Sequence, residues 1–167
     1  MIFVLPLLLL AVAAVLGIVA GHRGADAARP DDRPLALPPV DAPDATSPSC
    51  TRLLAALPAT LTASPHPVPR LPLAAPAPAG ATAWAGTVGG DPVVLRCGLP
   101  RPPELTNSSA LIVINGVSWL DLSQPGRDTF IAVDRPVYLA VTVPRDLGTG
   151  PVQTVSDTVR TTLPATN

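Results

Sequence analysis

The pattern of apolar positions is densest at the N-terminus, where residues 2–20 form an unbroken run, IFVLPLLLLAVAAVLGIVA. As a helix, this run would reach about 28 Å, close to the hydrocarbon thickness of a bilayer. The run is also longer than a usual signal-peptide core, although Ala25-Asp26-Ala27 has the small-x-small form of a cleavage site. The pattern therefore predicts an N-terminal hydrophobic helix over residues 1–20, either a transmembrane anchor or a signal peptide cut after Ala27.

The apolar pattern stops after this run, and residues 21–48 are rich in Pro, Ala and Asp. A segment of this composition predicts an extended linker rather than a packed element. A lipoprotein would carry cysteine just after the apolar core, and His22 stands at that position. We therefore expect a spacer over residues 21–48 and no attached lipid.

Two later segments show a helical period. The apolar positions of the first are Cys50, Leu53, Leu54, Leu57 and Leu61, and those of the second are Val152, Val155, Val159 and Leu163. This spacing places each set on one face of a helix. Ser49 is the expected N-cap of the first helix, and Pro58 is expected to end or bend it. Pro151 suits the first turn of the second helix, where a missing N–H costs nothing.

Strand-like segments lie between these two helices. They are residues 92–97, 111–114, 117–120, 129–133 and 137–143. Asn115-Gly116 between two apolar runs predicts a hairpin, because a type I′ turn needs positive φ at both central residues. Residues 62–80 are expected to be irregular or polyproline-like. We predict an α+β domain over residues 49–164: a small antiparallel sheet of about four to five strands with two amphipathic helices on one face.

The cysteine count changes the picture of the compartment. Cys50 and Cys97 are the two cysteines of the chain. In a chain with an export signal, such a pair is most simply a disulfide, whereas a redox C-x-x-C or a zinc site lacks the necessary neighbours. Arg23, Arg29 and Arg33 follow the apolar run, and by the positive-inside rule they would place the C-terminal domain in the cytoplasm. We give the cysteines more weight and expect the domain on the extracytoplasmic side of the cell membrane, or secreted if the leader is cut.

Composition excludes some partners. The formal net charge is −1 and the eleven basic residues, all arginine, are scattered. Such a chain has no electrostatic footprint for nucleic acid. We expect the membrane as a partner through residues 2–20, unless they are cleaved, and an envelope protein as a further partner.

Several short motifs resemble a known family. They are Cys50-Thr51-Arg52-Leu53-Leu54-Ala55-Ala56-Leu57-Pro58, Pro92-Val93-Val94-Leu95-Arg96-Cys97-Gly98, Asn115-Gly116-Val117-Ser118-Trp119, Asp134-Arg135-Pro136-Val137-Tyr138 and Val143-Pro144. Together they resemble the actinobacterial envelope proteins grouped as domain of unknown function 3515, over about residues 50–164. The resemblance implies an exported or membrane-tethered protein and no particular activity.

The sequence contains no catalytic motif such as G-x-S-x-G, H-E-x-x-H or a P-loop. We therefore predict no catalytic residues, no cofactor and no metal. Arg96, Trp119 and Arg135 are candidates for recognition. Each also has a structural interpretation: an outward-facing strand arginine, a buried core tryptophan and a turn residue with a local salt bridge.

Three functions compete. The favoured one is a non-enzymatic binding domain of the envelope, which predicts an exposed apolar or tryptophan-containing patch. The second is an envelope enzyme, for example a hydrolase, whose acids Asp91, Asp121 and Asp134 would converge near Arg96. The third is a small-ligand protein, which needs a pocket of roughly 300 Å³ or more between sheet and helices.

Overall fold

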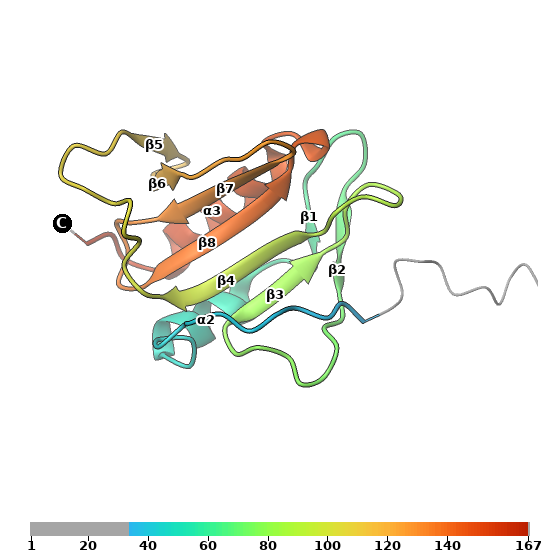
Figure 1. Ribbon diagram of the computed structural model, residues 1–167, viewed down its shortest axis with the longest axis horizontal. Coiled ribbons are helices and arrows are strands. Elements are labelled where there is room, and N and C mark those ends of the chain that lie inside the picture. Colours follow the sequence, from blue (N-terminus) through green and yellow to red (C-terminus); the bar gives the residue numbers. More distant parts are fainter. Residues whose placement is uncertain (1–33, 167) are drawn as a thin grey trace, which may run out of the picture. The chain divides into compact units, whose positions relative to one another are not determined.

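The computed structural model describes residues 34–166, which form one unit (Figure 1). The elements are, in chain order, α2 (Pro48–Ala56), β1 (Thr60–Leu61), β2 (Val68–Leu71), β3 (Ala81–Trp84), β4 (Val93–Leu99), β5 (Leu111–Ile114), β6 (Val117–Asp121), β7 (Arg127–Ala132), β8 (Tyr138–Pro144), the 3₁₀ turn η2 (Arg145–Leu147) and α3 (Gly150–Thr162).

The strands form one eight-stranded sheet in the order β1-β2-β3-β4-β8-β7-β6-β5. Every neighbouring pair is antiparallel. Both helices pack against the same face, behind the sheet in the view of Figure 1, and they contact each other. The predicted α+β class with two helices and an antiparallel sheet is therefore confirmed.

The predicted number of strands, four to five, is wrong. Three further strands, β1, β2 and β3, come from the segment after the first helix, most of which we expected to be irregular. Pro69 is tolerated because it lies in β2, next to the two-residue strand β1 at the sheet margin. Ala81–Trp84 is short and includes two alanines, which are depleted in strands, but it pairs along its whole length with β4. Tertiary pairing overrides local preference here.

The hairpin at Asn115-Gly116 is confirmed. Asn115 has φ of 49° and Gly116 has φ of 80°, so both central residues adopt the left-handed conformation that a type I′ turn requires. β5 pairs with β6 on either side of this turn, from Ile114↔Val117 outward. The last two strands, β7 and β8, are also antiparallel neighbours, from Arg127↔Pro144 to Ala132↔Leu139.

The helix boundaries differ slightly from the prediction. α2 begins at Pro48, and its N-cap is Ser47 rather than Ser49, because the Ser47 Oγ accepts a hydrogen bond from Cys50 N–H at 3.3 Å. Leu61 is buried as expected but lies in β1, since the helix ends before Pro58. In α3, Pro151 lies in the first turn, as predicted, whereas Leu163, expected on the helix face, is the C-cap residue just after the helix.

Residues 34–47, which we assigned to the linker, run along the domain. Leu35 N–H donates to Pro72 O at 2.8 Å, and Asp44 N–H donates to Gly98 O at 3.1 Å. Gly98 has φ of +85° and sits where the register of β4 against β8 shifts. A Cβ at Gly98 would lie 2.6 Å from Ala45 Cα. Glycine is therefore needed here both for its backbone conformation and for the close approach of residues 44 and 45.

Gly98→Ala should release residues 34–47 from the domain, because the new methyl group overlaps the backbone of Asp44 and Ala45. Limited proteolysis mapped by mass spectrometry should show new cleavage within residues 36–46. Gly126→Ala is the matched control, since Gly126 also has positive φ, at +87°, but no atom lies within 4 Å of its added Cβ. Equal protection of residues 36–46 in both variants would contradict this packing.

The predicted N-terminal anchor or signal peptide, residues 1–20, lies outside the described residues. Within residues 34–166, no helix has both the length and the apolar character needed to cross a bilayer.

Candidate functional site

The predicted disulfide is confirmed. Cys50 on α2 is bonded to Cys97 on β4, with their Cα atoms 5.7 Å apart. Both residues are fully buried within the hydrophobic core between helices and sheet. The bond therefore links α2 covalently to β4 in the middle of the sheet, and its burial indicates a structural role.

Trp119, a recognition candidate, is buried instead. It is 0% exposed on β6, and its indole Nε1–H donates to Ser156 Oγ on α3 at 3.0 Å. Ser156 Oγ in turn donates to Val152 O at 2.7 Å. The structural interpretation is therefore the one the geometry supports: Trp119 packs β6 against α3 and has its polar atom satisfied.

Arg135 is also buried, with its side chain 2% exposed. Its Nη1 donates to Asp134 O at 2.8 Å and lies 2.8 Å from Asp134 Oδ1, while its Nη2 donates to Gly116 O at 2.7 Å. The other carboxylate oxygen, Asp134 Oδ2, accepts from Ser118 N–H at 3.0 Å. The salt bridge that we predicted is present, but in a buried cluster that fastens the β5–β6 turn to the β7–β8 connection.

Arg96 lies on the sheet face opposite the helices. Its Nη2 donates to Pro38 O at 2.9 Å, so it holds part of the segment 34–47 against β4. Partial burial lowers the pKa of the Arg96 guanidinium from its ordinary value, but arginine stays charged in proteins. The three recognition candidates are therefore at three different places and do not form one site.

The acids of the enzyme hypothesis are separated as well. Asp91 lines a hollow of about 170 Å³ beside Arg127 and Thr142. Asp121 lies at the end of β6 and accepts hydrogen bonds from Ser123, while Asp134 belongs to the buried Arg135 cluster. The structure does not bring these three carboxylates together near Arg96.

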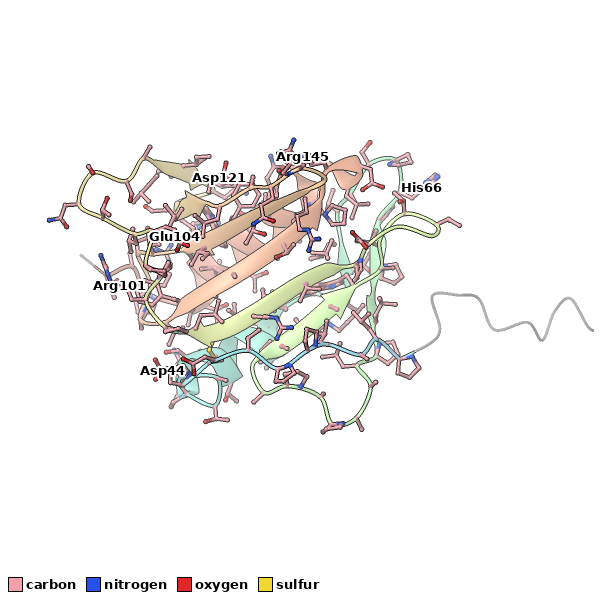
Figure 2. The ribbon with its side chains drawn as sticks, viewed as in Figure 1. Asp44, His66, Arg101, Glu104, Asp121 and Arg145 are labelled. Carbon is pink, nitrogen blue, oxygen red and sulfur yellow. A yellow bond between two sulfur atoms is a disulfide. The ribbon has the colours of Figure 1, made fainter. Side chains whose placement is uncertain are left out.

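A groove of about 360 Å³ opens between α3 and the β5–β7 end of the sheet. Its lining residues are Ile112, Ile114, Asp121, Ser123, Asp128, Phe130, Arg145, Thr149, Val152 and Gln153. The isoleucines, the phenylalanine and the valine make an apolar floor. Figure 2 shows Asp121 and Arg145 at this end of the sheet. The volume is at the lower end of small-molecule sites, so the small-ligand hypothesis stays a prediction.

The charged rim of this groove is partly neutralised. Arg145 Nε lies 2.8 Å from Asp128 Oδ1 in an ion pair that is half exposed. Neither residue is a candidate from the sequence alone, since nothing in the spacing of Asp128 and Arg145 indicates that β7 and η2 meet. Only the pairing of Arg127 with Pro144, which brings the two strand ends together, creates the contact.

Strand β5 borders the groove and forms the margin of the sheet opposite β1 (Figure 1). Three of its four side chains are exposed although all are apolar: Leu111 at 42%, Ile112 at 44% and Val113 at 68%. Ile112 and Ile114 face the groove, and Leu111 and Val113 face the other side of the sheet, because successive side chains alternate. This exposed apolar edge is the patch that the binding hypothesis predicted.

Comparison with known proteins gives one family. The family model described as "Protein of unknown function (DUF3515)" matches residues 8–167. Neither the curated proteins nor the solved structures include a match. The resemblance in the sequence motifs is thus confirmed over nearly the whole chain, and the protein belongs to the DUF3515 family.

Proposed function

We propose that this protein is an envelope component, exported or membrane-anchored, whose folded domain binds a partner protein without catalysing a reaction. The observation that carries the proposal is the exposed apolar edge strand β5, Leu111–Ile114. A surface of this kind binds an extended segment by adding it to the sheet as a further strand.

The backbone of β5 supports this binding mode. Ile114 and Val117 flank the two-residue turn, so in a hairpin of this type they exchange both of their hydrogen bonds. Hydrogen-bonded and non-hydrogen-bonded pairs alternate along an antiparallel ladder. The N–H and C=O groups of Leu111 and Val113 therefore point away from β6, toward the free edge. These groups are available to the main chain of a partner strand.

Among residues 34–166, which the structure describes, the edge also lacks the features that keep such strands from pairing. Proteins usually protect an edge with charges, proline, a bulge or a covering segment. Residues 105–120 contain no charged residue and no proline. By contrast, β1 at the opposite margin has only two residues and is next to Pro69. The domain therefore has one protected margin and one open margin.

The disulfide supports the location outside the cytoplasm. Structural disulfides persist in oxidising compartments and are rare in the cytosol of most organisms. Cys50 and Cys97 are bonded within the core. With the apolar run of residues 2–20, the bond is consistent with a domain held outside the membrane or released from it.

A site-specific photo-crosslinker at Val113 of the full-length chain tests the binding surface in living cells. We expect a discrete adduct of defined mass from position 113, because the side chain would lie against the added strand. Position 88 is the matched control, since Val88 is an exposed apolar residue, at 96%, in the loop before β4. It should give no such adduct.

Sequencing of the adduct by mass spectrometry then identifies the strand that contacts position 113. The same adducts from positions 88 and 113, or none from position 113, would contradict binding at β5.

A further inference from the structure

We infer that the strand added to β5 is β5 of a second copy of this chain, which gives a symmetric dimer with a continuous sheet. This inference rests on the proposed function, since it takes the β5 edge as the contact surface. It goes further because it names the partner and the register.

The chemistry of the edge suits a second copy of itself. β5 is apolar on both faces, with Ile112 toward the groove and Val113 on the opposite side of the sheet. A matching strand must likewise be apolar on both faces and free of charge, and β5 meets both conditions. Because residues 105–120 carry no charge, two such edges approach without repulsion.

The backbone directions then fix the register. A two-fold axis perpendicular to the sheet passes midway between one residue and the same residue of the second copy, and that residue is described here as lying on the axis. With Ile112 on the axis, Leu111 lies opposite the Val113 of the second copy, and Val113 lies opposite its Leu111. Both residues direct their N–H and C=O groups to the free edge, so each of these two pairs exchanges two hydrogen bonds. With Val113 on the axis, Leu111 would face Asn115, which is in the turn.

This arrangement brings the two grooves together. Ile112 lines the groove, and its non-hydrogen-bonded pairing with its own copy places the two side chains on the helix face of the sheet. The floors that contain Ile114 and Phe130 would then adjoin across the axis. The same edge is used by both copies, so the assembly closes at two and does not extend into a fibre.

The contact is small. Stable interfaces bury roughly 1,200 Å² or more in total, and four residues of strand with the groove margins form a smaller surface. We therefore expect a weak dimer whose amount depends on concentration.

Cysteine scanning of the full-length chain in detergent, with copper phenanthroline as oxidant, tests the register. The native cysteines are already bonded to each other, so an introduced cysteine is the reactive one. Ile112→Cys should form a disulfide-linked dimer about tenfold faster than Val113→Cys, because only the pair on the axis brings its Cα atoms within the roughly 4.4–6.8 Å that a disulfide needs. Val88→Cys should stay monomeric.

A second variant guards against oxidation by chance collision. Val113→Asp in the Ile112→Cys background should abolish the linked dimer, because it places like charges at the edge, and Val88→Asp should not. Val113 is largely exposed, so the aspartate is not expected to unfold the domain.

The outcomes separate the two proposals. Monomers at all concentrations, with an adduct from Val113 to a different protein, would overturn the self-pairing and keep the proposed function. Linked dimers that Val113→Asp leaves intact, or a ladder of species beyond the dimer, would overturn the self-pairing. Monomers with no adduct from Val113 would overturn both.

Discussion

Replacement of Arg135 by methionine should lower the free energy of unfolding by about 3 kcal/mol, since breaking a buried ion pair leaves its partner uncompensated. Methionine keeps much of the apolar volume but removes the contacts of the guanidinium with Asp134 and with Gly116 O. The Asp134 carboxylate, 24% exposed, then keeps Ser118 N–H as a hydrogen-bond donor. Its charge is no longer balanced by a neighbouring cation.

Urea unfolding followed by tryptophan fluorescence measures this loss. Trp84 and Trp119 are both fully buried, so their emission reports the unfolding of the described domain. Hydrogen exchange should also become faster at Ile114 and Val117, because Gly116 O in the turn between them has lost its partner.

Arg145→Met is the matched control for Arg135→Met. Arg145 also pairs with a carboxylate, Asp128, at 2.8 Å, but its side chain is 56% exposed. Exposed ion pairs contribute at most about 1 kcal/mol, because water solvates the separated charges well. Equal losses from the two methionine variants would show that the Arg135 cluster has no special role in stability.

The sequence predicted those elements whose signals are local. The type I′ hairpin follows from Asn115-Gly116, because asparagine and glycine readily adopt the positive φ that both central positions require. α3 follows from valines at helical spacing, and β8 from the alternation of Leu139, Val141 and Val143 with smaller or polar residues. Each of these patterns lies within a few residues of chain, where period and turn chemistry suffice.

The missed elements depend on contacts between distant residues. β2 contains Pro69 and lies in a proline-rich stretch. Its Arg70 nevertheless holds it in place through contacts with residues that are distant in the sequence. The Arg70 guanidinium donates to Leu57 O at 2.8 Å and lies 5.3 Å from the ring centroid of Trp84. A cation over an indole is favourable, and the same side chain also satisfies a carbonyl at the end of α2. Nothing in the spacing of these residues indicates that they meet.

In the candidate site too, local features could be predicted from the sequence, and features that depend on distant contacts could not. The binding hypothesis required an exposed apolar or tryptophan-containing patch, and Leu111 to Ile114 were predicted as a strand but not as that patch. That this strand is at the margin follows only from the order of the sheet, in which the connection after β4 passes three strands to reach β5. Trp119 and Arg135 were candidates because of their residue types, but their buried partners, Ser156 and Gly116, are set by the packing of the turn and α3.

Removal of the disulfide, by the double variant Cys50→Ala and Cys97→Ala, should lower the free energy of unfolding by about 4 kcal/mol in the chain-entropy model. The bond closes a long loop, with a sequence separation of 47. Within that loop lie β1, β2 and β3, which are short or rich in proline. The bond therefore restricts the unfolded chain over the segment whose local sequence favours strand formation least.

The wild-type protein provides its own control. A reductant added during urea unfolding should lower the wild-type midpoint toward that of the double alanine variant, and it should leave the variant unchanged. Because both cysteines are fully buried, the bond is expected to resist reduction in the folded state and to be reduced in the unfolded state.

Thiol titration and mass spectrometry of protein from its native compartment should find no free thiol. A reduced protein as stable as the oxidised one would refute the stabilising role, and two free thiols in native protein would also remove the main support for a location outside the cytoplasm.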